Sequence, residues 1–459
     1  MATKQARLTQ GPVGRHLVDM TVPVMFGIFM MMLQAFADAY FLGFVGDRPL
    51  AAISFAFPIL MVVTSVAIGL GAGTSSVVAR AIGAHDDRRA RRLATDSLIL
   101  SFSITAVISF IGVLTIDPLF RVLGAPEDMM PMIQGYMLIL YASTPFLVIG
   151  MVGMSSMRAT GDTRLPSKLM MVAAVVNIIL DPIFIFGFGP VPALGLNGAG
   201  YAALLTRVGI FAATLYYMKH RTHLLSFRLP GFDEMRNSWR DILHVGIPAA
   251  GTNAIIPAAM AVVTAMLAAH GPEAVAGFGV ASRIESMMLV IFYALSAIIG
   301  PFVGQNMSSN KADRIFEALR LCTLFCLGAG IVIAVILAAF SGVLPALFSD
   351  NPAVTDVTQL FLWIAPVSYG AYGMVMVMNA SFNGMGKPIP AVYVSLARMI
   401  VIYVPLAFLL DRFLGVAGIF IAYAVANVLT GILSYAWARS CVTEQCDKHG
   451  APVLASESP

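Results

Sequence analysis

Long apolar runs alternate with short polar segments along almost the whole chain. A helix needs about 20 mostly apolar residues to cross a bilayer, and by that measure the sequence predicts twelve membrane spans. Their ranges are about 17–45, 50–79, 94–116, 132–157, 168–188, 195–218, 243–270, 274–304, 317–340, 357–383, 390–411 and 415–438. Closely joined spans, such as the last two around Asp411 and Arg412, are expected to form tight hairpins. The pattern predicts an all-α integral membrane protein.

The chain also repeats itself. At an offset of 225 residues, Pro23 corresponds to Pro248, Arg89 to Arg314 and Gly161 to Gly386; at 220, Gly195 and Gly198 correspond to Gly415 and Gly418. Each copy holds six helices, an even number, so the copies insert with the same topology around a pseudo-two-fold axis along the membrane normal. The expected parts are an N-terminal segment 1–16, a first lobe 17–218, a linker 219–241, a second lobe 242–438 and a tail 439–459.

Basic residues mark one side of the predicted bundle. Of the 28 lysines and arginines, 22 fall in the termini and in the loops on one side, and only Arg48, Arg121 and Arg412 fall in the opposite loops. Basic loops stay in the cytoplasm. We expect both termini to be cytoplasmic, in the plasma (inner) membrane of a bacterium or archaeon.

Composition excludes several classes of protein. Hydrophobic residues make up 59% of the chain and charged residues 11%, whereas a soluble protein has about 25% charged residues. This argues against a soluble enzyme, a disordered protein and a basic nucleic-acid-binding protein. The four cysteines fit neither a disulfide framework nor a zinc site. We find no phosphate-binding glycine loop and no hydrolase motif, so we expect no enzyme activity and no cofactor.

Six ionisable residues lie well inside the predicted spans, namely Asp38, Asp181, Arg207, Arg283, Glu285 and Arg398. A charge in hydrocarbon is costly, so each needs a reason. Asp38 is 15 residues beyond Pro23, about 22 Å along its helix, and Asp181 is 12 residues into its span, about 18 Å. Both carboxyl groups are therefore expected at similar depth, in the outer half of the membrane.

The two aspartates have polar neighbours one helical turn away, Gln34 and Asn177. Two close carboxylates cannot both ionise cheaply in a low dielectric, so the pair can carry a proton; with the Asn177 oxygen it can instead offer ligands to Na⁺. Alternatively, each aspartate is satisfied separately by backbone or hydroxyl donors. The second half has aliphatic residues at the corresponding positions, Val263, Ile402 and Leu406, which favours ion coupling by the first half.

The other polar residues at depth allow two interpretations each. Glu285 is either a second protonatable site or a structural partner of a neighbouring helix, and Arg207 and Arg398 are expected to anchor helices or to hold a carboxylate ionised. The methionine clusters, represented by Met30, Met154 and Met157, either line an adaptable substrate cavity or pack in the core.

Several short motifs make the chain resemble the multidrug and toxic compound extrusion (MATE) family of secondary transporters over roughly 15–440. They are Gln34-Ala-Phe-Ala-Asp38, Arg158-Ala-Thr-Gly161-Asp162, Asn177-x-x-x-Asp181-Pro182, Val303-Gly304-Gln305-Asn306 and Asn383-Gly384-Met385-Gly386, in this order. The resemblance implies a twelve-helix, two-lobed antiporter. It implies export of amphipathic, often cationic drugs in exchange for protons or sodium, as a monomer in the bilayer that does not bind nucleic acid.

The resemblance places the coupling cation on Asp38, Asn177 and Asp181, with two departures from the family pattern. Ala203 stands where the family often has a threonine, and Thr206 compensates only if its helix is rotated; this favours protons over sodium. Ile256 stands where one branch has a glutamate, which argues against a cation site of that kind in the second half.

Two alternatives lie outside drug export. A flippase for lipid-linked oligosaccharides or peptidoglycan precursors would need several cationic groups to hold a pyrophosphate, and few basic residues lie at depth. A channel or receptor would conduct or signal without gradient-driven accumulation.

Overall fold

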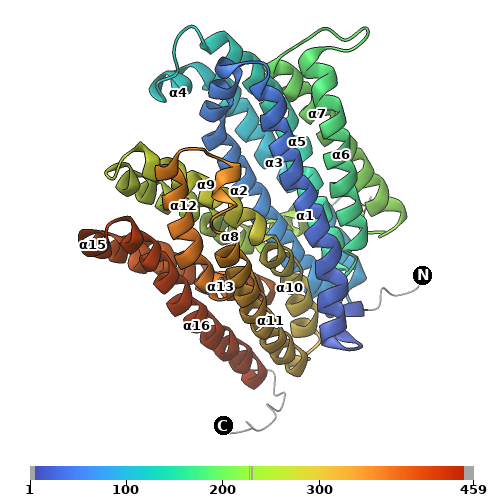
Figure 1. The fold of residues 1–459 in the computed structure, drawn as a ribbon. Coiled ribbons are helices and arrows are strands. Elements are labelled where there is room, and N and C mark those ends of the chain that lie inside the picture. Colours follow the sequence, from blue (N-terminus) through green and yellow to red (C-terminus); the bar gives the residue numbers. More distant parts are fainter. Residues whose placement is uncertain (1–5, 227, 229–230, 449–459) are drawn as a thin grey trace. The chain divides into compact units, whose positions relative to one another are not determined.

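A computed structural model describes residues 6–226, 228 and 231–448. Lys4 of the predicted N-terminal segment, residues 227, 229 and 230 of the predicted linker and 449–459 of the predicted tail lie outside the described residues. Twelve helical stretches are long and apolar enough to cross a membrane, and the only extended pairing among the described residues is one bridge between Phe188 and Val191. The predicted all-α architecture with twelve spans is confirmed (Figure 1).

The first six spans comprise α1 (Val13–Gly43), α2 (Asp47–Gly83), α3 (Asp87–Leu114), α5 (Met130–Ala159), α6 (Arg164–Phe186) and α7 (Leu196–His220), with the short α4 (Ile116–Val122) after the third. The second six comprise α8 (Phe232–Ala268), α9 (Pro272–Met288) with α10 (Val290–Ser308), α11 (Ala312–Ala339), α12 (Pro352–Ile364) with α13 (Tyr369–Met385), α14 (Ile389–Leu396) with α15 (Val404–Leu414), and α16 (Val416–Lys448). A π-helical segment, η4 (Ala397–Tyr403), joins α14 to α15.

The helices extend beyond the apolar runs that predicted them. Helix α8 begins at Phe232, although its apolar run starts near 243, and α16 continues to Lys448 through residues expected in the tail. Hydropathy detects only the lipid-embedded part, whereas a helix can continue into water on polar residues. The last hairpin turns at Gly415 rather than at 411–412, because Asp411 and Arg412 still belong to α15.

The repeated glycines occupy equivalent turns. Gly195 and Gly415 have φ of +55° and +58°, in a region that side chains disfavour. One turn later, a Cβ added to Gly198 would lie 2.3 Å from the Phe184 carbonyl oxygen, and one added to Gly418 would lie 2.3 Å from that of Leu410. Both pairs are glycine for the same steric reasons, which supports the duplication.

Contacts divide the described residues into two compact units, 22–250 and 6–21 with 251–448. Helix α5 packs against α2, α3 and α7 in the first unit, and α13 packs against α10, α11 and α16 in the second. The division falls inside the first helix of each half rather than in the linker, close to Pro23 and Pro248. The start of each first helix therefore belongs to the unit of the other half.

Candidate functional site

A cluster of polar side chains lies within the helices of the first unit. Helix α1 contributes Gln34 and Asp38, α6 contributes Asn177 and Asp181, and α7 contributes Thr206. Asn177 and Asp181 are each 1% exposed, whereas Asp38 is half-buried. The structure thus brings together Asp38, Asn177 and Asp181 with Gln34 and Thr206, whereas Glu285, the remaining candidate, lies in the second unit.

Hydrogen bonds connect the three helices. Gln34 Nε2 donates to Asn177 Oδ1 at 2.5 Å, and Asn177 Nδ2 donates to Thr206 Oγ1 at 3.4 Å. The Thr206 hydroxyl donates in turn to the carbonyl of Ala202 at 2.9 Å. Thr206 therefore faces the cluster, although it lies three residues after Ala203, the position where the family often has its threonine. Asn177, on α6, connects α1 to α7 through these hydrogen bonds.

The two carboxyl groups interact directly. Asp38 and Asp181 lie within hydrogen-bonding reach of one another. Asp38 Oδ1 and Asp181 Oδ2 are buried and receive no donor from any described residue. Ionised carboxylates only accept hydrogen bonds, and unsatisfied buried acceptors are costly. Two carboxyl groups this close can share one proton or supply oxygen ligands to a small cation.

A positive charge on α7 acts on Asp38. The Arg207 guanidinium interacts electrostatically with Asp38, but it donates its hydrogen bond to Ser143 Oγ on α5 and forms no ion pair with the described carboxylates. Tyr136 on α5 lies near Arg207 and both carboxyl groups. Sequence reasoning missed Ser143 and Tyr136, although the duplication carries a signal for the serine, since Ser368 stands 225 residues later.

A second polar cluster surrounds Glu285 in the second unit. The Tyr423 hydroxyl donates to Glu285 Oε1 at 2.8 Å. Arg398 is 3% exposed and donates to Asn427 Oδ1 at 3.1 Å, while Asn427 Nδ2 donates to Ser368 Oγ at 3.0 Å. Arg398 anchors a neighbouring helix, as the sequence suggested, and Glu285 is bonded by a tyrosine rather than by a cation.

The nominated methionines and the remaining arginine lie in different environments. Met154 and Met157 are 6% and 0% exposed, which places them in the packed interior of the first unit, and Met30 is partly buried. Arg283 is exposed. Of the three methionines, Met30 alone has substantial accessible surface in this structure.

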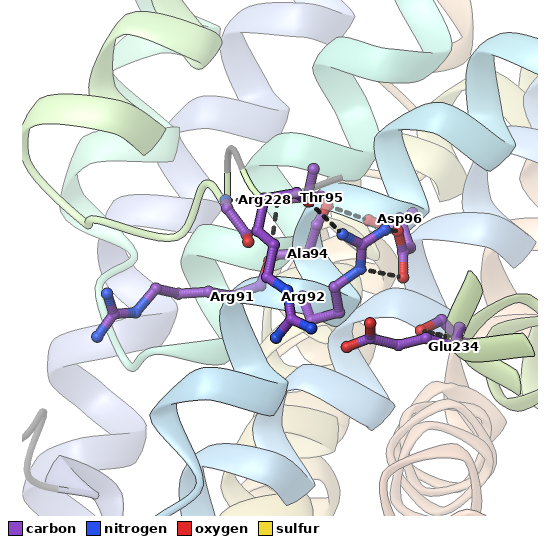
Figure 2. Close-up of polar contacts among 10 residues, drawn as sticks. Arg91, Arg92, Ala94, Thr95, Asp96, Arg228 and Glu234 are labelled. Carbon is purple, nitrogen blue, oxygen red and sulfur yellow. Dashed lines mark hydrogen bonds and ion pairs between the residues drawn. The ribbon is translucent and has the colours of Figure 1, made fainter. Parts of the chain in front are cut away.

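Hydrogen bonds from α3 hold the linker, and one of them comes from an arginine in a buried ion pair that sequence reasoning missed. Arg92 binds Asp96 through two of its nitrogens, and the side chains are 9% and 0% exposed. Arg92 Nη1 donates to the Arg228 carbonyl at 2.8 Å, and the Ser226 amide donates to Thr95 Oγ1 at 2.8 Å (Figure 2). A cavity of about 380 Å³ beside the pair is lined by residues of both signs, including Arg88, Glu234 and Asp241.

Comparisons with known proteins agree with the duplicated architecture. The sequence profile of the MatE family matches twice, over residues 23–183 and 248–409. The chain is 37% identical to a FAD transporter of Shewanella oneidensis, over 93% of this chain and 95% of that protein. It is 25% identical to a probable multidrug resistance protein of Bacillus subtilis, YoeA, over 85% and 86%.

Solved structures give the same result. The MATE transporter VcmN of Vibrio cholerae, in its bent form, superposes with a TM-score of 0.90 at 31% identity, over 97% of this chain and 99% of that one. An outward-facing structure of a multidrug resistance MATE transporter superposes with a TM-score of 0.91 at 26% identity, over 97% and 100%.

Proposed function

Because the chain belongs to the MatE family of multi-pass membrane transporters, we propose that it exports amphipathic, often cationic compounds in exchange for protons or sodium ions. Its relatives are transporters, which confirms the resemblance drawn from the motifs and the expectation that the chain is not an enzyme. Multidrug resistance proteins among those relatives support drug efflux. The exported compounds and the coupling ion are our proposal.

The observation that carries this proposal is the pair of buried carboxylate oxygens without a donor, Asp38 Oδ1 and Asp181 Oδ2. A proton on one carboxyl group would give it a donor toward the other. A sodium ion would need further oxygen ligands, and the Asn177 carbonyl oxygen already accepts the Gln34 bond at 2.5 Å. We therefore favour protons, with Na⁺ on Asp38, Asn177 and Asp181 as the alternative.

Coupling would follow from the position of Asp38 on α1. Protonation removes its charge and alters its interactions with Asp181 and with Arg207. If the two cavity orientations prefer different protonation states and different substrate occupancy, the downhill flow of protons drives export. The Gln34 bond to Asn177 would keep α1 registered against α6 while this occurs.

The proposed setting is the bacterial or archaeal inner membrane, with a monomer as the working unit. The strongly basic loops would face the cytoplasm, together with both termini.

Reconstitution into liposomes tests the proposal. A pH gradient and a sodium gradient are imposed separately, and export of the fluorescent cation ethidium is followed. We expect the pH gradient to drive export and Asp38→Asn to abolish it. Asp19→Asn, an exposed change on the same helix, serves as the matched control and should transport normally. Full gradient-driven export by Asp38→Asn would exclude the coupling role.

A flavin dinucleotide is a second candidate substrate, since one relative at 37% identity is named a FAD transporter. Two phosphates would require cationic groups, and the arginines at depth are Arg207, Arg283 and Arg398. The same requirement applies to the flippase alternative, which has no relative among those described to support it. Competition between FAD and ethidium in the same liposomes distinguishes the candidates, since a FAD exporter should show saturable inhibition by FAD.

A further inference from the structure

The environment of Glu285 is unusually rich in tyrosine. Five tyrosines interact with this carboxylate or with each other around it, namely Tyr293, Tyr369, Tyr372, Tyr403 and Tyr423. Tyr423 packs edge-on against Tyr403 at 5.4 Å and against Tyr372 at 6.5 Å between ring centroids. They come from α10, α13, η4 and α16, so four elements of the second unit converge on one residue of α9.

The negative charge of Glu285 has no contact counter-ion. Arg283 lies two residues away on the same helix, and residues two apart on a helix do not face each other. No basic residue in the described part of the chain forms an ion pair with Glu285. Glu285 and Tyr293 are both partly exposed, whereas Tyr369, Tyr372, Tyr403 and Tyr423 are buried. Glu285 thus keeps part of its surface accessible beside a largely buried group of tyrosines.

Arg398 does not serve as that counter-ion. Its guanidinium carbon lies 4.3 Å from the centre of the Tyr372 ring, and its Nη1 is bonded to Asn427. The positive charge of Arg398 influences Glu285 electrostatically, but the two side chains do not form an ion pair. Arg398 therefore fixes Tyr372 and α16 in place, while the Glu285 carboxylate accepts a hydrogen bond from the Tyr423 hydroxyl and lies near the Tyr369 hydroxyl.

The duplication argues that this set is not part of the common scaffold. Leu60 stands at the position equivalent to Glu285, Leu147 at that of Tyr372 and Ile178 at that of Tyr403. The first half builds the same fold with aliphatic residues there. A carboxylate is costly to place in a membrane helix bundle, and the first half builds the same fold without one at this position.

We propose that Glu285 and the surrounding tyrosines form a binding site for the positively charged group of an organic ammonium or phosphonium substrate. A carboxylate supplies the counter-charge, and aromatic faces attract a weakly hydrated cation through their quadrupoles. The site lies within the second unit and shares no residue with the Asp38–Asp181 pair. It rests on the proposed export function and assigns to the second half the recognition of cationic substrates.

Ethidium binding to the purified full-length protein tests the site, followed by fluorescence polarisation. We expect Glu285→Gln to weaken binding at least tenfold and Tyr423→Phe to weaken it a few-fold. Glu273→Gln, an exposed acid on the same helix, is the matched control and should bind normally. Wild-type affinity in Glu285→Gln would overturn the site and leave Glu285 as a proton carrier or structural group.

A second measurement needs no variant. A hydrophobic carbodiimide modifies the Glu285 carboxyl group of the wild-type protein, and mass spectrometry of the α9 peptide gives the rate. Tetraphenylphosphonium should slow this modification, whereas the uncharged dye Nile red should not. Equal rates with and without tetraphenylphosphonium would contradict the proposal even if Glu285→Gln fails to fold. Failure of the export function would appear differently, as intact ethidium binding and protection without any gradient-driven transport.

Discussion

The two units form an equivalent hydrogen bond between helices with different side chains. In the first, Arg207 on α7 bonds Ser143 on α5; in the second, Asn427 on α16 bonds Ser368 on the segment before α13. The serines are 225 residues apart and their partners 220 apart, the same two offsets that relate the glycines. The first unit places a charge at a position where the second places an amide, so a shared hydrogen bond has been kept while its electrostatics have changed.

The polar interiors differ more strongly. The first unit holds two carboxyl groups with buried, unsatisfied oxygens, and the second holds one carboxylate with a tyrosine donor and a buried arginine nearby. A pair of carboxyl groups suits a small ion, and a carboxylate among aromatic rings suits a large organic cation. The difference teaches that duplication preserves the turns and helix contacts while individual side chains diverge in chemistry.

The basic ends of the units also differ. The first unit holds the linker through the buried Arg92–Asp96 pair, whereas the second holds the N-terminal segment through Arg314, which donates to the carbonyl oxygens of Gly11 at 2.6 Å and Leu8 at 3.0 Å. Arg314 relies on neutral acceptors at least partly open to solvent. One fastening therefore depends on a buried charge pair and the other on several weaker bonds.

The largest expected effect is at the first of these fastenings. Arg92→Ala leaves Asp96 buried without its partner, and breaking such a pair costs about 3–5 kcal/mol. Thermal unfolding of the solubilised protein should show a large drop in the midpoint. Arg89→Ala removes an exposed pair with Asp241 and should cost about 1 kcal/mol or less. Equal losses from the two changes would contradict the distinction between buried and exposed pairs.

The next effect tests the equivalence of the turns. Gly198→Ala and Gly418→Ala each place a Cβ 2.3 Å from a carbonyl oxygen, so each should lower the free energy of unfolding by about 1–3 kcal/mol. Gly209→Ala meets no atom within 4 Å and should leave stability unchanged or raise it slightly. Thermal midpoints of the three variants decide the matter, and a loss confined to one half would show that the turns are not equivalent.

A smaller effect, on transport, is expected when the first half is given the residue of the second. Asn177→Ile copies Ile402 and removes the acceptor of the Gln34 amide, leaving a polar group unsatisfied at a cost of about 1–3 kcal/mol. We expect gradient-driven ethidium export to fall about tenfold, corresponding to about 1.4 kcal/mol. Ile402→Val is the control and should transport normally. Unchanged export by Asn177→Ile would remove Asn177 from the coupling site.

The smallest effect concerns the hydroxyl that stands in for the family's usual threonine. The Asn177–Thr206 hydrogen bond is long, 3.4 Å, and Thr206→Ala should therefore reduce proton-driven export only about two- to threefold, since long bonds contribute little. Thr206→Ser keeps the hydroxyl and should be nearly unchanged. If Thr206→Ala instead loses sodium-driven export completely, the hydroxyl would be acting as a cation ligand and the preference for protons would be wrong.

Much of the fold follows from local properties of the chain. Twelve spans, the duplication and the equivalent glycine turns are visible because hydropathy and offset are properties of the sequence alone. The ends of the helices are not visible in this way, since α8 and α16 continue on polar residues that need contacts or water rather than lipid. The division of α1 and α8 between the units also depends on contacts that no periodicity reports.

The sequence by itself determined that the chain crosses a membrane in two six-helix copies and that Asp38, Asn177 and Asp181 are polar where their counterparts are aliphatic. Only the tertiary structure decided what those groups touch. It turned Thr206 toward Asn177, left Asp38 Oδ1 and Asp181 Oδ2 without donors among the described residues, and surrounded Glu285 with tyrosines from four elements. The physical reason is that the free-energy cost of burying a polar residue follows from its position in a membrane span. The hydrogen bonds and charges that offset this cost come from residues far away in the sequence.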